Sequence, residues 1–398
     1  MSTRMENRAR AAALVALAGL TALTAAPPRA NAGSGVVTLA DPCTGSSNPT
    51  FYANNHRMLV SPGGRLLALY DPDGNDVELA WEDSGGSWRT RSLYGGVSDE
   101  ASSDRPASIA TDGRGNAWVV WSGYKFSQEL PVRLRRLTDL DAPEGPTVGP
   151  LITVQAAGRG NAFADLAFRG GRGFIVWLQR KDETRYSLQT IQFTRLGTDT
   201  PSFRNEATLY TGSSPAMAGT LVATPRGMRV VALAGGLRVF SHVSGARWRA
   251  GSARARAPAE TKPSAIVVKG GILAAFQSSL SAGGVVKVVR FSNTGDRIST
   301  SLTTRGGYMQ PSLAGGRRTA WLVMVTGGLQ SSVVSRRYDG SRWGGDVTEI
   351  SADARDGGDY AYPNTARRVS TTLRFLVDGE RCPTRAVSNS VIYYERPV

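Results

Sequence analysis

The sequence predicts an all-β fold, a β-propeller of about seven four-stranded blades, on the basis of three observations. A short segment that often contains proline recurs seven times at intervals of about 51 residues, which is the size of a propeller blade. Each copy is followed by a glycine- or arginine-bearing turn and then by an apolar run rich in β-branched and aromatic residues. After residue 32 we find no amphipathic helical pattern, so strands account for the repeat.

The copies of the repeat begin near residues 56, 106, 162, 215, 263, 311 and 363. The apolar runs that follow them, such as AWVVW and FIVWL, are short and bounded by turns, which is typical of strands buried on both faces. Sheets with two apolar faces have to be covered by neighbours on both sides, as blades are in a ring. A β-sandwich is the alternative, but it would not require seven copies of one pattern.

Tryptophans occupy two kinds of position in the repeat. Four lie inside the apolar runs, where we expect core packing rather than a sugar-binding surface. Three more end a recurring G-x-x-W turn, and we expect these to pack between blades. The first set is Trp118, Trp121, Trp177 and Trp321, and the second is Trp88, Trp248 and Trp343.

The ends of the chain suggest how the ring closes. The last copy has three strands, near 364–369, 371–377 and 389–395. The segment Gly35–Ala40 precedes the first copy and has no blade of its own, so we expect it to supply the fourth strand of the last blade. This arrangement would bring Cys43 towards Cys382, and in an oxidising compartment the pair would form a disulfide that locks the ring.

The first 32 residues predict a secretory signal peptide, and residues 33–398 a single propeller domain. A basic region is followed by an apolar run, Ala11–Ala26, and by an A-x-A cleavage site before Gly33. The alternative is a membrane anchor, but the run is shorter than the ~20 residues that span a bilayer. We therefore expect a secreted, extracellular monomer that does not associate with membranes.

The chain is strongly basic, with a formal net charge of +15, and its cations are almost all arginine. Such a surface attracts polyanions through its long-range field. The alternative is a compositional bias towards arginine, which the even scatter of these residues along the chain favours. No nucleic-acid-binding motif is present, so nucleic acid is not an expected partner.

One turn resembles a motif of the sialidase-like propellers. In the segment WEDSGGSW, the residues Asp83, Gly85 and Trp88 fit the D-x-G-x-x-W part of that family's Asp-box, with Trp81 where the box begins with serine. The family's Arg-Ile-Pro motif is absent, because Arg105 is followed directly by proline. The resemblance therefore implies the fold, and in that family the Asp-box stabilises a turn.

Several classes of chemistry lack their motifs. The chain has two histidines, His56 and His242, and no H-E-x-x-H, G-x-S-x-G, P-loop or zinc-spaced cysteine and histidine cluster. The segment DPDGNDVE places four oxygen-bearing side chains around a glycine, which suits calcium, although the same composition favours a plain turn. These side chains are Asp71, Asp73, Asn75 and Asp76, and we expect no other cofactor.

Loops that enter the first strands and loops between second and third strands meet at one end of a propeller channel, where propellers bind ligands. Here those loops supply a mixture of arginine, tyrosine and carboxylate side chains that suits a carboxylated or polyhydroxylated glycan and also any solvated rim. The candidate binding residues are His56, Arg57, Arg105, Arg180, Arg185 and Tyr360.

The sequence favours a non-catalytic binding or scaffold propeller that recognises extracellular or cell-wall carbohydrate. The alternative is a secreted, sialidase-like glycoside hydrolase acting on an anionic glycan. In that case Asp104 or Glu183 would be the acid/base and Tyr362 the nucleophile, with Arg57 and Arg105 anchoring the substrate carboxylate.

Overall fold

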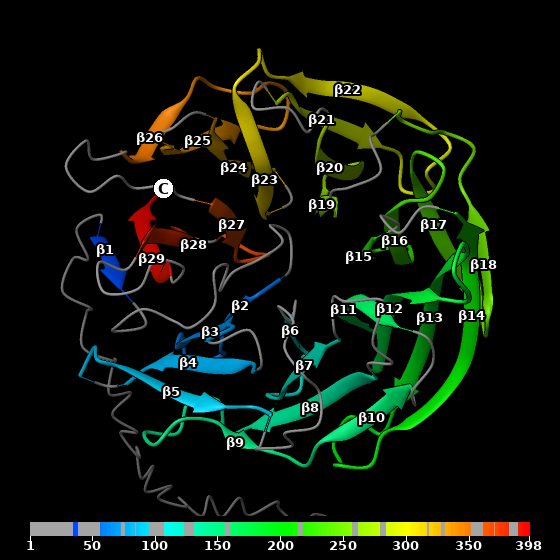
Figure 1. The fold of residues 1–398 in the computed structure, drawn as a ribbon, viewed down its shortest axis with the longest axis horizontal. Helices are drawn as coiled ribbons and strands as arrows, with labels where there is room; N and C mark the ends of the chain where they lie inside the picture. Colours follow the sequence, from blue (N-terminus) through cyan, green and yellow to red (C-terminus); the bar gives the residue numbers. More distant parts are fainter. Residues whose placement is uncertain are drawn as a thin grey trace, which may run out of the picture. The chain divides into compact units, whose positions relative to one another are not determined.

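The computed structural model describes residues 35–38, 56–72, 76–83, 85–94, 107–122, 131–155, 160–213, 218–256, 262–278, 284–316, 318–327, 331–351, 361–369, 371–381 and 389–398. Within the unit Ser34–Val398, all the regular elements of these segments are β-strands, and they form seven blades in a ring (Figure 1). The described segments contain no apolar helix of membrane-spanning length.

Each blade is an antiparallel sheet whose strands follow one another from the centre of the ring outwards. Blade 1 has β2 (Met58–Val60), β3 (Leu66–Tyr70), β4 (Glu78–Glu82) and β5 (Trp88–Ser92). Blade 2 has β6 (Ala107–Thr111), β7 (Ala117–Trp121), β8 (Val132–Thr138), β9 (Thr147–Val148) and β10 (Ile152–Gln155). Blade 3 has β11 (Asn161–Arg169), β12 (Arg172–Arg180), β13 (Tyr186–Thr194) and β14 (Ser202–Gly212).

The second half of the ring repeats this plan. Blade 4 has β15 (Gly219–Thr224), β16 (Gly227–Leu233), β17 (Leu237–Ser244) and β18 (Arg247–Ala250). Blade 5 has β19 (Ser264–Val268), β20 (Gly271–Gln277), β21 (Val286–Phe291) and β22 (Ile298–Thr303). Blade 6 has β23 (Tyr308–Gly315), β24 (Ala320–Thr326), β25 (Val333–Tyr338) and β26 (Val347–Ile350). Blade 7 has β27 (Ala361–Thr365), β28 (Thr372–Arg381), β29 (Asn389–Pro397) and β1 (Gly35–Thr38).

The predicted ring closure is confirmed. Strand β1 pairs with β29, with Gly35 opposite Glu395 and Thr38 opposite Ile392, and Figure 1 shows the blue β1 beside the red β29. Two details differ from the prediction. The first strand of blade 7 is Ala361–Thr365, earlier than expected, and the fourth strand of blade 2 is split into β9 and β10, both of which pair with β8.

The core lies between the blades, as the two-sided burial of the second strands predicted. Every residue of β3, β7 and β16 is buried. Seven of the eight clusters of buried apolar side chains among the described residues fill one interface each, and the eighth adds to the interface of blades 3 and 4. The closing interface packs Met58 and Leu66 of blade 1 against Leu376 and Tyr393 of blade 7.

Both expectations for the tryptophans are confirmed. The four in the apolar runs are at most 4% exposed. Of the G-x-x-W set, Trp88 contacts the ring of Tyr393 in blade 7, and Trp248 that of Phe174 in blade 3. Trp343 donates from Nε1 to Ser301 Oγ of blade 5 at 2.9 Å. Each of these tryptophans therefore packs against the neighbouring blade on one side.

The Asp-box turn is stabilised by its aspartate, as the resemblance implied. Asp83 Oδ1 accepts hydrogen bonds from the backbone N–H groups of Gly85 and Ser87, both at 2.9 Å. Asp339, which the D-x-G-x-x-W spacing excludes, does the same in blade 6 by accepting from the N–H groups of Ser341 and Arg342. A carboxylate can thus cap this turn from a position one residue closer to the tryptophan.

Both cysteines lie outside the described residues, so the disulfide remains a prediction, and the strand pairing supports it. Cys43 follows β1 by five residues, and Cys382 directly follows β28, which pairs with β29. We expect a Cys43–Cys382 disulfide to lower the intact mass of the chain by about 2 Da relative to the reduced chain, and reduction to lower its stability by about 4–5 kcal/mol because the loop is long. Non-reducing mass spectrometry that detects two free thiols would contradict this prediction.

Candidate functional site

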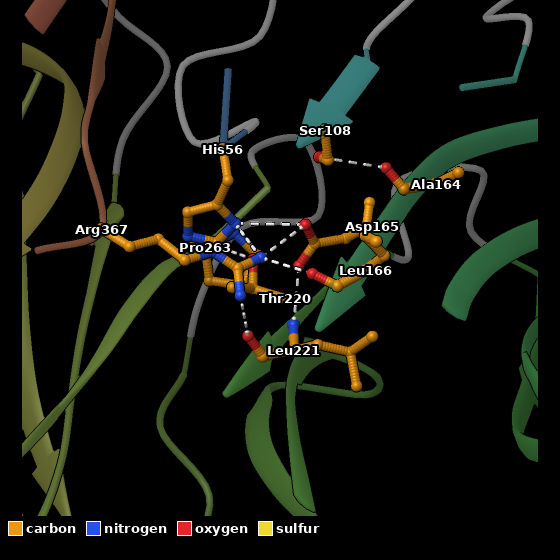
Figure 2. A network of polar contacts seen from close by, with 9 residues as sticks. All are labelled: His56, Ser108, Ala164, Asp165, Leu166, Thr220, Leu221, Pro263 and Arg367. Atoms are coloured by element: carbon orange, nitrogen blue, oxygen red, sulfur yellow. Dashed lines mark hydrogen bonds and ion pairs between the residues drawn. The ribbon is translucent and has the colours of Figure 1, made fainter. Parts of the chain in front are cut away.

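The first strands of the blades surround the channel, and no further strand of the described residues pairs with their inward edges. Three of these strands are irregular. The pairing shifts between Ala162 and Asp165 in β11, and Phe163 there has a left-handed φ of 56°. Similar shifts interrupt β23 and β27. Bulges of this kind re-aim side chains, and in β11 the bulge precedes the only carboxylate drawn in Figure 2.

Polar contacts link each first strand to the next around the channel, and we call this set the polar collar. From blade 1 to blade 4, Ile109 N donates to His56 O, Ser108 Oγ to Ala164 O, and Leu221 N to Asp165 Oδ2. From blade 4 to blade 7, Thr220 Oγ1 donates to Pro263 O, Leu313 N to Ser264 Oγ, and Thr365 N to Ser312 Oγ. Arg367 Nη2 lies 2.6 Å from His56 Nδ1 and joins blade 7 to blade 1.

Asp165 is the centre of the collar and is fully buried. Its Oδ1 lies 3.1 Å from His56 Nδ1 and 3.0 Å from Arg367 Nη2, and its Oδ2 accepts from Leu221 N at 2.8 Å (Figure 2). Lys262, buried just before β19, also interacts electrostatically with this carboxylate. One carboxylate therefore interacts, through hydrogen bonds or opposite charge, with groups of blades 1, 4, 5 and 7.

Arg367 reaches into the channel from the turn between β27 and β28 (Figure 2). Besides Asp165, its Nη2 donates to Leu166 O at 2.8 Å, and its Nη1 donates to Leu221 O at 3.3 Å. The side chain is 25% exposed. The planar guanidinium thus satisfies carbonyls of blades 3 and 4 from blade 7, a geometry that an ammonium group could not reproduce.

Burial and charge set the protonation states of the cluster. Burial opposes ionisation of Asp165, but the positive charges of Lys262 and Arg367 and the hydrogen bond from His56 outweigh it and hold the pKa of this carboxyl far below its usual range. Burial and the charge of Arg367 lower the pKa of His56 to about 4, so the imidazole is neutral at pH 7. Burial lowers the pKa of Lys262 to about 8, although Asp165 opposes that shift.

These states determine what the cluster can do chemically. A neutral imidazole with its proton on Nδ1 donates to Asp165, whereas with the proton on Nε2 its Nδ1 accepts from Arg367. A carboxylate held ionised by neighbouring cations cannot donate a proton at neutral pH. The cluster in Figure 2 therefore has the properties of a structural ion-pair network that ties blades together.

The sequence candidates divide into three groups. His56 and Arg57 are both buried at the start of blade 1, and His56 belongs to the collar. Asp104, Arg105 and Tyr360 lie outside the described residues, as does the side chain of Tyr362 on β27. The third group, which the structure does bring together, is Arg180, Glu183 and Arg185.

The turn between β12 and β13 holds this third group. Asp182 Oδ1 accepts from the N–H groups of Thr184 and Arg185, at 3.0 and 2.9 Å. Arg185 pairs with the same carboxylate, and Arg180 Nε donates to Asp182 O at 3.0 Å. Backbone hydrogen bonds from Thr184 and a bond from Arg185 lower the pKa of Asp182 to about 2. Glu183 projects from this fixed turn and is exposed.

Half of the calcium candidates can be placed. Asp71 is buried after β3, and Asp76 accepts from Val77 N at 2.6 Å, whereas Asp73 and Asn75 lie outside the described residues. Within the described part of the chain, no three histidine, cysteine or acidic side chains gather as a metal site. The calcium site remains a prediction.

Asp165, the centre of the collar, is not among the residues predicted from the sequence. This aspartate lies inside the apolar run NAFADLAF. A buried carboxylate requires hydrogen-bond or cationic partners, so its position in such a run is a sequence signal for a polar network. Its partners lie 109 and 202 residues away at His56 and Arg367, so no local pattern connects them.

Removing the central charge should destabilise the ring. We expect Asp165→Asn to cost about 3–5 kcal/mol of unfolding free energy at pH 7, because it leaves buried cations without their counter-charge. Urea denaturation followed by tryptophan fluorescence would measure this loss. Asp199→Asn, which removes the exposed partner of Arg136, is the matched control and should cost much less. Equal losses for the two variants would contradict a central role for Asp165.

The lowered pKa of His56 predicts a pH dependence of stability. Between about pH 6.5 and 4 the unfolded chain binds a proton at this imidazole that the folded chain does not, so stability falls as the pH falls. From pH 6.5 to 5 this amounts to about 2 kcal/mol. We expect His56→Gln to flatten the dependence in that window, as measured by urea denaturation at pH 7, 6 and 5. An unchanged slope would show that His56 does not cause it.

Comparison with known proteins returns structural neighbours of low sequence identity. No protein-family model matches the sequence, and no curated protein matches it. Among solved structures, Trypanosoma rangeli sialidase is similar at 13% identity and a TM-score of 0.48, over 79% of this chain and 57% of that one.

The same sialidase in complex with sialic acid is similar at 12% identity and a TM-score of 0.48, over 88% and 59% of the two chains. AofleA from Arthrobotrys oligospora is similar at 10% identity and a TM-score of 0.47, over 79% and 90%. This chain thus spans less than two thirds of the length of the sialidase structures.

Proposed function

We propose that this protein is an exported β-propeller that binds carbohydrate without cleaving it. The observation that carries the proposal is the state of Asp165, the carboxylate at the centre of the channel network. A glycoside hydrolase needs two carboxyl groups, or a carboxyl and a tyrosine, across one open site, and its acid must hold a proton at working pH. Asp165 is buried, ionised and shared among cations, so its role is to hold blades together.

The turn between β12 and β13 supplies the binding surface in this proposal. It lies at the end of blade 3 where the chain passes from the second to the third strand, the end at which propeller loops converge. Asp182 fixes its backbone, so little conformational entropy is lost when a ligand binds there. The exposed carboxylate of Glu183 and the guanidinium of Arg185 offer acceptors and donors to sugar hydroxyl or carboxylate groups.

Export rests on the amino-terminal pattern of a basic region, an apolar run and an A-x-A site. An exported chain with this surface meets extracellular and cell-wall glycans, and that is the class of ligand we propose. Secretion itself can be tested by amino-terminal sequencing of protein from the culture medium, where we expect the mature chain to begin at Gly33.

A glycan array combined with fluorogenic glycosides tests the function. We expect the wild-type protein to retain acidic or polyhydroxylated glycans and to release no fluorophore, and Glu183→Ala with Arg185→Ala to weaken retention by about tenfold through lost charge-assisted hydrogen bonds. Arg89→Ala is the matched control, because Arg89 is an exposed arginine paired with a turn aspartate at the other end of the strands.

Two outcomes would contradict the proposal. Hydrolysis that Asp104→Ala or Glu183→Ala abolishes would establish the glycoside hydrolase instead. Retention that Arg89→Ala weakens as much as the double variant does would remove the turn between β12 and β13 from the binding surface.

A further inference from the structure

The turns between the first and second strands carry a cation in every blade. In blades 1 to 6 the chain leaves the inner strand through a segment that contains glycine or proline together with arginine or lysine, and in blade 7 the turn carries two arginines. We call this set the inner-turn ring, and its members are Arg65, Arg114, Arg169, Arg172, Arg226, Lys269, Arg318 and Arg368. All of them are exposed except Arg65, which is half-buried.

The inner-turn ring lies on one face of the propeller. Because every blade has the same antiparallel order, its first turn leaves the ring on the same side. Neighbouring turns touch: Arg169 donates to Thr224 O at 2.8 Å and to Pro225 O at 2.6 Å, and Gly315 N donates to Arg367 O at 3.3 Å. This face is the opposite one to the turn between β12 and β13, which lies at the other end of the strands.

No carboxylate of the described residues neutralises the seven exposed members of the ring. None of them forms an ion pair within the described part of the chain. The one acidic residue in these turns, Asp112, is buried and accepts from the N–H groups of Arg114 and Asn116 at 2.8 and 3.3 Å. The side chain of Arg65 donates to the carbonyls of Leu140 and Ala142.

Acidic side chains also lie on this face, in turns between third and fourth strands. One of them, Asp141, accepts from Ser61 Oγ and, at 2.9 Å, from Gly63 N in the inner turn of blade 1. Five others pair with arginines that are not in the inner-turn ring. The pairs are Asp83 with Arg89, Asp199 with Arg136, Asp296 with Arg249, Asp339 with Arg342, and Asp346 with Arg336. Five carboxylates of this face are thus neutralised by other arginines, and Asp141 lies against the turn that holds the half-buried Arg65, so the seven exposed cations of the ring keep their charge within the described part of the chain.

The arginines of blades 3 and 4 crowd together on this face. Arg229 is 4% exposed and donates from Nε to Asn293 O at 2.6 Å. Burial lowers the pKa of its guanidinium, and the positive charges of Arg169, Arg249 and Arg226 lower it further. Like charges held this close repel one another, and a bound anion would relieve the repulsion.

We infer that the inner-turn ring binds an anionic polysaccharide. Guanidinium groups match carboxylate and sulfate oxygens in a bidentate geometry, and cations spread over seven turns suit a polymer better than a small ion. The turns contain no aromatic side chain on which nucleic-acid bases could stack. The large apolar side chains that are exposed in the described segments, Val243, Val347 and Val398, lie outside the ring, which leaves it without an anchor for a bilayer.

The test measures binding of dextran sulfate, polygalacturonate and uncharged dextran to the full mature chain by calorimetry at increasing salt. The ring variant is R114Q/R172Q/R226Q, because these three side chains make no hydrogen bond or ion pair within the described residues. We expect it to bind the two anionic polymers at least about tenfold more weakly and to show a salt slope shallower by up to about three. Uncharged dextran should not bind to this face.

The matched control is R204Q/R247Q/R342Q, which removes the same charge from exposed arginines outside the ring and should change affinity by no more than about twofold. Equal weakening by both variants would show that overall charge, not the ring, attracts the polymer, and no weakening by the ring variant would also overturn the inference. Ring-dependent binding of duplex DNA or anionic vesicles that exceeds polysaccharide binding at physiological salt would assign the face to those partners.

The inference is independent of the proposed function. Arg185→Ala, on the other face, should leave polyanion binding at the inner-turn ring unchanged, whereas the ring variant should leave glycan retention by the turn between β12 and β13 unchanged. The failure of one proposal can thus be told from the failure of the other.

Discussion

The innermost strand of each blade is a sheet edge that faces the central channel and pairs with no further strand of the described residues. Its inward N–H and C=O groups have to be satisfied, because a buried backbone group without a partner costs about as much as a lost hydrogen bond. The polar collar supplies polar contacts between neighbouring blades around the channel. Examples are the bond from Ser108 Oγ to Ala164 O and the bond from Thr365 N to Ser312 Oγ. Apolar packing between blades closes the ring, and the collar sets how each blade is placed against the next.

The distribution of charged side chains differs between the channel and the face formed by the inner turns. At the centre, Asp165 gathers cations from distant parts of the chain and is held ionised by them. At the face formed by the inner turns the situation is reversed, since arginines lie close together and five aspartates of that face bind arginines outside the inner-turn ring. The seven exposed cations of the ring form no ion pair within the described residues, in contrast to Asp165 in the channel.

Much of the fold could be predicted from the sequence, because each blade is a local repeat with its own turns and apolar runs. The closure by Gly35–Thr38 could also be predicted, since counting strands leaves blade 7 one short. The split fourth strand of blade 2 could not, because outer strands are half-exposed and their sequences carry a weak pattern.

The candidate site was harder to predict than the fold. His56 could be identified as a candidate from the sequence, but its pairing with Asp165 and Arg367 depends on contacts across the channel. In four copies a serine or threonine follows the repeat proline within two residues, at Ser108, Ser264, Ser312 and Thr365. The structure shows that these residues link neighbouring blades through the collar.

The pairing of β1 with β29 has a consequence for how the chain is made. Synthesis proceeds from the amino end, so Gly35–Thr38 is made before the strands of blades 1 to 6 and has no partner until Asn389–Pro397 follows. During that interval the apolar face of blade 1 that later contacts Leu376 and Tyr393 is also uncovered. Completion of the domain is therefore a single late event at one seam, and proteolytic loss of either strand would reopen the ring at the same place.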